Sequence, residues 1–333
     1  MKALTFKRYG KSPDIGFSNI DRPTLQPNEL LVQVYAAGLN PIDNMIPVGT
    51  FKPVMNFKLP AVLGSDLAGV VVEVGRNVTK FKPGDEVFAS IFDLGKGSLA
   101  EFAAVPESAA ALKPANLDFV QAASIPMVGL TSWQALKERM NLRRGQKVFI
   151  PAGSGGIGTF AIQLARQLGA TVGTTVSTGG IELVRKLGAD EIVDYKTQDF
   201  EKLLRGYDGV LGTVRGDAIE KSLDILKPGA QIVSLIGPLD AAFAEARKLN
   251  FFLKFVFGLM SRKLRKLAGK KGVNYTFLFV RPDGQQLTEI GELLRTERIQ
   301  PVIDKVFPFD QAKDALEYLA LGRAKGKVVV RIR

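Results

Sequence analysis

The segment with the clearest chemical signal fits the pattern G-x-G-x-x-G and consists of Gly153, Ser154, Gly155, Gly156, Ile157 and Gly158. It follows an apolar run over residues 147–152 that is typical of a strand, and apolar residues recur at helical spacing over residues 157–168. In that context Gly153 allows a tight turn, Gly155 lets the backbone approach a pyrophosphate, and Gly158 lets the helix pack closely on its strand. The free N–H groups of the helix would face the phosphates. The segment predicts a dinucleotide site; the alternative is a merely flexible turn.

The end of the second predicted strand, residues 170–176, indicates which dinucleotide the site takes. Sites for NAD usually hold the ribose 2′-hydroxyl with an Asp or Glu at this point. Here no carboxylate precedes Glu182, whereas Ser177 and Thr178 can donate hydrogen bonds to a 2′-phosphate. The sequence therefore favours NADPH as the cofactor. The alternative is that Ser177 and Thr178 only begin a turn.

Cysteine and histidine are both absent from the 333 residues. Zinc sites draw mainly on Cys and His, and the Asp and Glu that remain suit magnesium or calcium better, so we expect no zinc site. Disulfides and imidazole acid–base chemistry are excluded as well. The N-terminus lacks the apolar run of a signal peptide, and no segment has the ~18–20 apolar residues that span a bilayer. We therefore expect a cytoplasmic protein.

The order of predicted elements indicates two kinds of domain. Before residue 118, runs rich in β-branched residues alternate with Gly and Pro and helical periodicity is scarce, which predicts a compact, mostly β domain. Over residues 147–236, strand-like runs alternate with helical segments, which predicts an α/β, doubly wound parallel sheet of the Rossmann type. From residue 302 onward, two strand-like segments flank a helix. The length suits about two domains.

A basic and apolar segment follows the predicted Rossmann region. Residues 247–271 carry nine basic side chains and no acidic one, which is most of the net charge of +12. The segment also holds ten large apolar residues within residues 251–267, and fully burying each one is worth ~1.5–3 kcal/mol. We therefore expect it to line the substrate cleft or a subunit contact, with its charges exposed. The alternatives are a peripheral membrane contact through residues 249–267 and nucleic-acid binding, which ranks third because no aromatic platform motif accompanies the charge.

Several segments, in matching order, resemble the quinone oxidoreductase branch of the zinc-independent medium-chain dehydrogenases/reductases. Residues 36–43 (AAGLNPID) are similar to the A-G-x-N-P-x-D segment of that branch, and residues 63–69 (LGSDLAG) to its G-x-D-x-x-G signature. Residues 97–102 (GSLAEF) match its G-x-x-A-E-[YF] element, and residues 326–329 (GKVV) its C-terminal G-K-V-V. The resemblance runs over nearly the whole chain, and several matches in order are far more specific than any one.

The resemblance implies an architecture. Residues 1–122 and 299–333 would form a β-rich, GroES-like catalytic domain, and residues 123–298 a Rossmann nucleotide-binding domain, with the active site in the cleft between them. It also implies a homodimer that acts on a small molecule and binds no nucleic acid. Zinc-binding relatives place Cys and His where this chain has Asn40, Asp43 and Ser65, which agrees with the composition.

The resemblance further implies which residues contact the cofactor. A departure from the family pattern is that many members carry Lys soon after the second strand, where this chain has Gly179, Gly180 and Ile181, so the charge of the 2′-phosphate must be compensated elsewhere. Besides the glycine segment, Ser177 and Thr178, the predicted cofactor contacts are Thr131 near the nicotinamide, Thr213, Tyr195 beside the adenosine phosphate, and Arg323 and Lys325 from the tail.

The implied reaction is hydride transfer from NADPH to the activated C=C bond of an enone or enal, or to a quinone. Negative charge then develops on the substrate's carbonyl oxygen, and Asn40 has an amide NH2 suited to stabilise it. Asp43 could orient Asn40 or the ribose; the alternative for Asn40 is a turn residue before Pro41. Phe51 stands where relatives often have Tyr, so we expect the proton to come from water or the ribose and Phe51 to form a wall of the substrate pocket.

The competing hypothesis is a protein that keeps the dinucleotide but has little turnover. It would act as a membrane or RNA adaptor, and the basic segment would be its contact surface. Asn40 and Thr131 argue for the enzyme.

Overall fold

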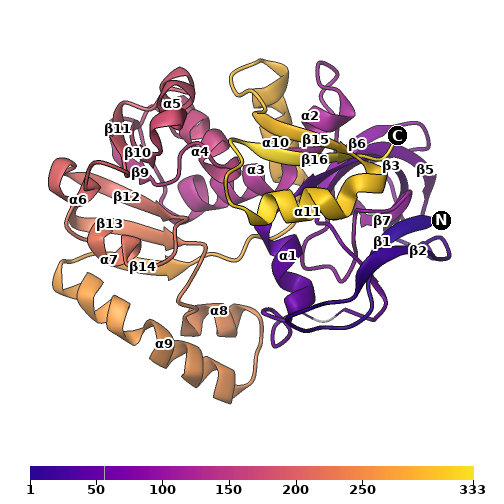
Figure 1. Ribbon diagram of the computed structural model, residues 1–333, viewed down its shortest axis with the longest axis horizontal. Coiled ribbons are helices and arrows are strands. Elements are labelled where there is room, and N and C mark those ends of the chain that lie inside the picture. The colour runs from indigo at the N-terminus through magenta and orange to yellow at the C-terminus, as the bar shows by residue number, and fades with distance from the viewer. Residues whose placement is uncertain (56) are drawn as a thin grey trace. The chain divides into compact units, whose positions relative to one another are not determined.

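The protein is described by a computed structural model that covers residues 1–55 and 57–333 (Figure 1). The chain forms two compact units. Unit 1 consists of Met1–Leu130 and Arg281–Arg333, and unit 2 of Thr131–Val280. Residues 123–130 and 281–298, which the sequence analysis placed in the nucleotide-binding domain, lie in unit 1.

Unit 1 is built on two β-sheets. The smaller has the order β2-β1-β4, and the larger has the order β15-β16-β3-β5-β6-β8, with β7 paired to β3. Leu30, Val32 and Leu67 are fully buried in the core that the larger sheet forms. The strands are β1 (Lys2–Phe6), β2 (Ile15–Asn19), β3 (Glu29–Leu39), β4 (Ala61–Val62), β5 (Asp66–Val74), β6 (Glu86–Ser90), β7 (Phe102–Pro106), β8 (Ala110–Leu112), β15 (Ile303–Pro308) and β16 (Lys327–Arg331).

The C-terminal strand β16 is a central member of the larger sheet rather than an appendage. It pairs antiparallel with the end of β3, with Val328 opposite Leu39, and parallel with β15. The β-rich domain predicted from the start and the tail of the chain is therefore present, and its larger sheet pairs residues from both ends of the chain.

Short helices connect and cover the strands of unit 1. Helix α1 begins with a proline at its first position and ends at Gly49, whose φ of 93° suits glycine, so both ends have the residues that favour them. The Asn44 side chain donates to the Leu316 carbonyl at 2.9 Å and ties α1 to α11. The helices are α1 (Pro41–Val48), η1 (Glu107–Ala109), α2 (Phe119–Ala123), α3 (Pro126–Trp133, which reaches unit 2), α10 (Gly284–Arg295), η4 (Phe309–Gln311) and α11 (Ala312–Ala320).

Unit 2 contains a six-stranded parallel sheet with the order β11-β10-β9-β12-β13-β14. Numbered along the chain this is 3-2-1-4-5-6, the order of doubly wound dinucleotide-binding sheets, which confirms the predicted Rossmann type. Phe149, Tyr207 and Ile232 are fully buried in its core. The strands are β9 (Lys147–Ile150), β10 (Thr171–Val176), β11 (Glu191–Asp194), β12 (Tyr207–Gly212), β13 (Leu226–Ser234) and β14 (Asn274–Phe277).

The helices of unit 2 follow the alternation expected of such a sheet. A π-helical turn, η2 (Gln134–Arg139), continues α3 and precedes β9. The others are α4 (Gly156–Gln167), η3 (Thr178–Gly180), α5 (Ile181–Lys186), α6 (Phe200–Leu203), α7 (Ala218–Ser222), α8 (Ala241–Ala246) and α9 (Phe251–Lys270).

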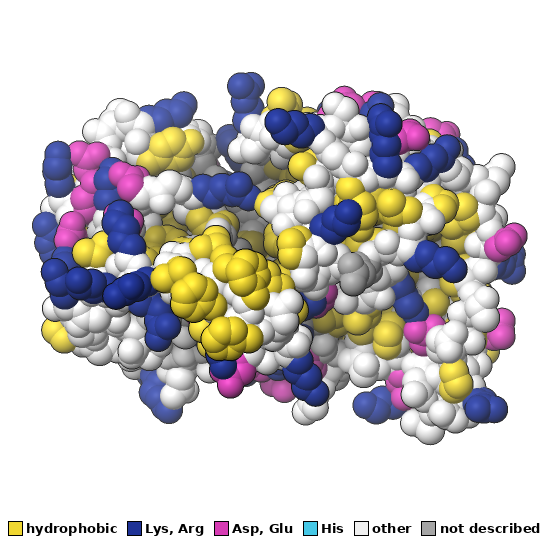
Figure 2. Space-filling view, turned by 90° about the horizontal axis from the view of Figure 1, so that it is seen from below, with side chains coloured by type: hydrophobic (Ala, Val, Ile, Leu, Met, Phe, Trp, Pro, Cys, Tyr) yellow, Lys and Arg dark blue, Asp and Glu magenta, His cyan; other side chains and the backbone are white. Residues whose placement is uncertain are grey.

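The basic and apolar segment forms α9, and its apolar residues are only partly buried. Phe257 and Leu264 lie in the protein interior, but five other large apolar residues are half or more exposed: Phe251 (82%), Phe252 (69%), Phe255 (56%), Leu259 (50%) and Met260 (52%). Figure 2 shows such side chains gathered on the face of the molecule where α9 lies. Burial in the core of the protein thus accounts for one face of the helix only, and the prediction that the segment lines the substrate cleft or a subunit contact stays a prediction. No helix in the described part of the chain is long and apolar enough to cross a membrane.

Candidate functional site

The glycine segment forms the turn between β9 and α4, as predicted. A Cβ on Gly153 would lie 2.2 Å from the Thr174 hydroxyl, and one on Gly158 would lie 2.5 Å from the carbonyl of Ala152, so the fold itself requires both glycines. A Cβ on Gly155 would have the Ala152 oxygen at 3.3 Å as its near contact. The space beside Gly155 is therefore not filled by the protein, as expected where a ligand approaches the backbone.

The N-terminus of α4 is open to an anion. Gly155 is the N-cap residue and has no side chain to accept from the first-turn N–H groups, so they have no side-chain cap. Ala152 adopts a left-handed φ of 55° in the turn. The Thr213 hydroxyl donates to the Pro151 carbonyl at 2.8 Å and joins the ends of β12 and β9, the point where the strand order of the sheet reverses. Dinucleotides bind at this point in such sheets, and these residues fit a pyrophosphate.

The end of β10 carries a carboxylate neighbour that the sequence analysis missed. The Thr178 hydroxyl donates to Asp194, the last residue of β11, and the backbone N–H of Lys196 donates to the same carboxylate at 3.0 Å. The Thr178 hydroxyl and this N–H hold the pKa of Asp194 below its usual range. Tyr195 lies beside them, 60% exposed, and its N–H donates to the Val176 carbonyl. The structure thus brings Thr178 and Tyr195 together and adds a negative charge beside them.

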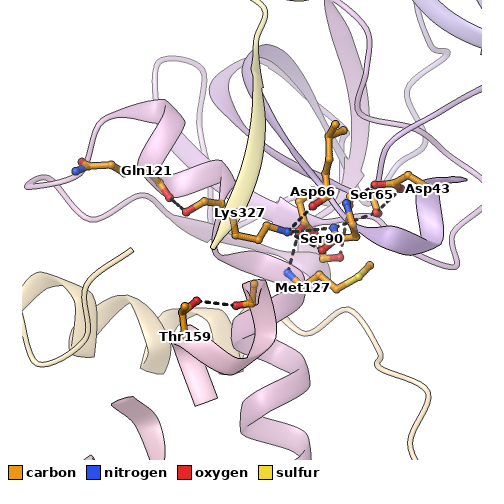
Figure 3. Close-up of polar contacts among 12 residues, drawn as sticks. Asp43, Ser65, Asp66, Ser90, Gln121, Met127, Thr159 and Lys327 are labelled. Atoms are coloured by element: carbon orange, nitrogen blue, oxygen red, sulfur yellow. Dashed lines mark hydrogen bonds and ion pairs between the residues drawn. The ribbon is translucent and has the colours of Figure 1, made fainter. Parts of the chain in front are cut away.

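Unit 1 holds a buried polar network around Asn40 (Figure 3). The Lys327 ammonium, from β16, donates to the Asn40 side-chain oxygen at 2.6 Å and to the Leu39 carbonyl at 2.8 Å. It lies 3.6 Å from the carboxylate of Asp66 on β5. The Asn40 amide NH2 in turn donates to Asp66 at 2.9 Å. Lys327 therefore fixes the Asn40 amide with its oxygen toward the lysine and its NH2 toward β5.

Asp43 completes the network from the first turn of α1. Its carboxylate accepts from the Asn40 backbone N–H at 2.7 Å and from the Ser65 hydroxyl at 2.6 Å. Ser65 also accepts from the Asn40 amide NH2 at 3.3 Å. Asp43 is fully buried and Asn40 is 3% exposed. The structure thus joins the two predicted catalytic residues, and it adds Ser65, Asp66 and Lys327, for which the matching motif segments were the available signal.

The network holds one more acidic group than basic groups. Burial raises the pKa of Asp43 to about 7, against the lowering effect of the Ser65 and Asn40 hydrogen bonds. Burial also raises the pKa of Asp66, opposed by Lys327, and lowers the pKa of Lys327, opposed by Asp66 and Asp43. With Lys327 and Asp66 paired, the group that takes up a proton near neutrality is Asp43.

This geometry limits what Asn40 can do directly. Both hydrogens of its amide NH2 face acceptors inside the protein, Asp66 and Ser65. The bond to Ser65 is the longer one at 3.3 Å. To stabilise a substrate oxygen, Asn40 would exchange that bond for one to the substrate and keep the bond to Asp66.

The other predicted site residues lie in both units. Thr131 is buried on α3 at the start of unit 2, and Ser177 is half-buried at the end of β10. Phe51 is half-buried in the turn after α1, and Arg323 and Lys325 are exposed in unit 1. Their contacts with cofactor or substrate stay predictions. In the described ranges, 1–55 and 57–333, no three acidic side chains gather as a metal site.

Two glycines of the turn should separate folding from cofactor binding. Gly158→Ala should destabilise the protein by ~1–3 kcal/mol, because its Cβ would overlap the backbone of Ala152 and Gly153. Gly155→Ala should change stability by less than ~0.5 kcal/mol but weaken dinucleotide binding, because its Cβ would occupy the side a pyrophosphate approaches. Urea unfolding and calorimetric NADPH titration measure the two effects. Equal loss of stability in both variants, or unchanged affinity in Gly155→Ala, would contradict this.

Asp43 should make stability depend on pH. Its pKa is 3.8 ordinarily and about 7 in the fold, so between these values the folded protein holds a proton that the unfolded chain has released. Its contribution therefore falls as pH rises through that window, by up to ~4 kcal/mol, and is constant above it. Asp43→Asn should flatten this slope in urea unfolding followed from acid to neutral pH. The exposed Asp314→Asn is the control; the same slope in both variants would refute the assignment.

Comparison with known proteins places the chain in a family. The alcohol dehydrogenase GroES-like domain matches residues 26–115, and the zinc-binding dehydrogenase family matches residues 187–330. The chain is 36% identical to the mitochondrial NAD(P)H oxidoreductase RTN4IP1 of Danio rerio, over 100% of this chain and 91% of that protein. It is 34% identical to the chloroplastic NADPH-dependent alkenal/one oxidoreductase of Arabidopsis thaliana, over 99% and 79% of the two chains.

A solved structure extends the match to three dimensions. The quinone oxidoreductase from Coxiella burnetii superposes with a TM-score of 0.84 at 30% identity, over 100% of this chain and 99% of that one. The predicted fold, a GroES-like domain with a Rossmann-type parallel sheet, is confirmed. The chain belongs to the medium-chain dehydrogenase/reductase family, in its quinone oxidoreductase-like branch.

Proposed function

We propose that this member of the NAD(P)H oxidoreductases is an NADPH-dependent reductase that transfers hydride to the activated C=C bond of an enone or enal, or to a quinone, without zinc. The observation that carries the proposal is the glycine turn before the uncapped N-terminus of α4, at the strand-order reversal of a dinucleotide-type sheet. The full-length similarity to an alkenal/one oxidoreductase and to a quinone oxidoreductase supports the acceptor class.

Residues of unit 1 would donate hydrogen bonds to the charge that develops in such a reaction. NADPH, when bound, supplies the hydride, and negative charge develops on the acceptor's oxygen. Lys327 fixes the Asn40 amide by its oxygen, and exchanging the long NH2 bond to Ser65 for one to the substrate would let Asn40 stabilise the developing oxyanion. Phe51 would form one wall of the pocket for an apolar acceptor. The family description names zinc, but a chain without Cys or His lacks the usual ligands for it.

The preference for NADPH rests on the end of β10. Neither β10 nor residues 177–181 after it contain a carboxylate, and Ser177 and the exposed Tyr195 can contact a 2′-phosphate. The carboxylate of Asp194 is nearby, but the Thr178 hydroxyl and the Lys196 N–H bind it and hold it on β11. Arg323 and Lys325, both exposed, would supply the positive charge.

A second candidate function is dinucleotide binding with little turnover, as a membrane or RNA adaptor. The observation that favours it is that the Asn40 NH2 is already fully bonded to Asp66 and Ser65 inside the protein.

We also propose that the protein is a homodimer, because of the family resemblance. We propose that it is cytoplasmic, because a chain without cysteine forms no disulfides.

Steady-state NADPH oxidation against a panel of enones, alkenals and quinones tests the enzyme function. We expect turnover with at least one acceptor, no stoichiometric zinc by elemental analysis, and no loss of rate with a chelator. Tight NADPH binding without turnover on any acceptor would favour the second candidate. Activity that a chelator abolishes and zinc restores would overturn the zinc-free proposal.

Calorimetry with NADPH and NADH tests the cofactor preference. Arg323→Ala should weaken NADPH by about ten- to a hundredfold, the worth of one charged hydrogen bond, and leave NADH nearly unchanged. Asp194→Asn should strengthen NADPH relative to NADH, because it removes the negative charge beside Thr178 while its oxygen still accepts from the hydroxyl. Equal affinities of the wild-type protein for both cofactors would refute the preference.

A further inference from the structure

Helix α9 presents one continuous exposed surface, here called the outer face of α9. Its first half is apolar and its second half basic. Figure 2 shows the two halves side by side, with large yellow side chains next to a group of dark blue ones. The outer face consists of the exposed residues Phe251, Phe252, Phe255, Leu259, Met260, Arg262, Lys263, Lys266 and Lys270.

The opposite side of α9 fixes which residues point outward. Phe257, Ser261, Leu264 and Ala268 recur at spacings of three and four and are buried. Leu264 and Ala268 belong to the core of unit 2, and the Asn250 side chain caps the helix by accepting from the Leu253 N–H at 2.9 Å. Because this inner side is anchored, α9 cannot turn to hide its phenylalanines without pulling Leu264 from the core.

The charge on this helix is of one sign and partly uncompensated. Residues 247–271 contain no acidic residue. Carboxylates elsewhere in unit 2 pair with Lys254, Lys263 and Lys271. For Arg262, Arg265, Lys266 and Lys270, the described ranges of the chain offer no carboxylate within ion-pair distance. Exposed apolar side chains beside unpaired cations are complementary to a surface that is apolar inside and anionic at its boundary.

We propose that the outer face of α9 docks on an anionic lipid surface, a property beyond the reductase activity. Phe251, Phe255 and Leu259 enter the boundary between head groups and acyl chains, while Arg262, Lys266 and Lys270 contact lipid phosphates. Amphipathic helices with aromatic and basic side chains bind membranes in this way, lying in the interface rather than crossing it.

A second copy of the chain fits this surface less well. In a two-fold dimer the same patch meets itself, so the unpaired cations of both copies would face a surface without carboxylates. A protein partner would also need a groove shaped for side chains that protrude as far as Phe251, which is 82% exposed. A lipid interface needs no shape match, and its phosphates supply the missing negative charge.

Co-sedimentation of the full-length protein with vesicles tests the proposal. We expect binding to phosphatidylcholine vesicles that contain phosphatidylglycerol, about tenfold or more above binding to phosphatidylcholine alone, and loss of this excess at about 1 M salt, where charges are screened beyond about 3 Å. The triple variant Phe251→Ser, Phe255→Ser, Leu259→Ser should lower partitioning by about fivefold or more per residue. The triple variant Arg262→Gln, Lys266→Gln, Lys270→Gln should lower it by about fivefold per charge.

Matched control variants distinguish the effect of the outer face of α9 from the effect of the protein's total charge and exposed apolar content. Leu112→Ser, Leu203→Ser, Leu321→Ser removes three apolar side chains elsewhere that are also more than half exposed, and Lys186→Gln, Lys202→Gln, Lys227→Gln makes the same change in net charge as the basic α9 variant. Both controls should bind vesicles like the wild-type protein. A loss as large in the controls as in the α9 variants would overturn the proposal.

Three further outcomes would also overturn it. One is no binding to anionic vesicles at low salt. Another is binding to a single-stranded RNA oligonucleotide that exceeds vesicle binding and depends on the same residues, which would make the outer face a nucleic-acid surface. The third is a concentration-dependent dimer that the apolar variant abolishes. NADPH turnover of a water-soluble acceptor without lipid should be equal in all variants, and this separates failure of docking from failure of the proposed reductase function.

Discussion

The buried ammonium of Lys327 is the interaction on which the organisation of unit 1 depends. From the C-terminal strand β16, it binds the Leu39 carbonyl at the end of β3, the Asn40 side chain before α1, and the Asp66 carboxylate on β5. Removing one partner of a buried pair costs ~3–5 kcal/mol, since the other charge stays buried and unpaired. The C-terminal strand is thereby bound to the N-terminal strands by the hydrogen bonds and ion pair of Lys327 as well as by sheet pairing. A chain lacking β16 would leave Asp66 without its counter-charge.

The same network sets the orientation of the Asn40 amide and the pKa of Asp43. Because Lys327 takes the Asn40 oxygen, the NH2 must point toward Asp66 and Ser65, so the orientation of the amide follows from the charge. Burial raises the pKa of Asp43 to about 7, and the ammonium of Lys327, which is paired with Asp66, opposes this only weakly. The Ser65 hydroxyl links the carboxyl of Asp43 to the amide of Asn40. A change in the protonation of Asp43 would therefore change the hydrogen bonds that hold the Asn40 NH2.

The sequence predicted those parts of the fold that depend on short segments of the chain. The glycine turn, the parallel sheet and the β-rich domain were visible because turn geometry and periodicity are properties of short segments. The contact of Thr178 with Asp194 was not, because it depends on β11 lying next to β10, and the search for a carboxylate stopped at the second strand. The matching motif segments contain both Asp66 and Lys327, but these residues are far apart in sequence, and the segments do not show that the two side chains pair. The exposure of Phe251 and Phe255 was missed because apolar residues occur on both faces of α9, and periodicity alone does not say which face meets the core.

One side of α9 attaches the helix to unit 2 and the other side is exposed, so an exposed apolar surface coexists with a stable fold. Its attachment to unit 2 comes from Phe257, Leu264 and Ala268, which are buried whether or not anything covers the outer face. Burial of a large apolar side chain is worth ~1.5–3 kcal/mol, so five exposed ones leave a substantial free energy unused in the isolated chain. That free energy is available to association, and the unpaired cations in the second half of the helix restrict association to surfaces that bring negative charge. Folding therefore constrains one side of α9, and the proposed docking on an anionic lipid surface would account for the composition of the other side.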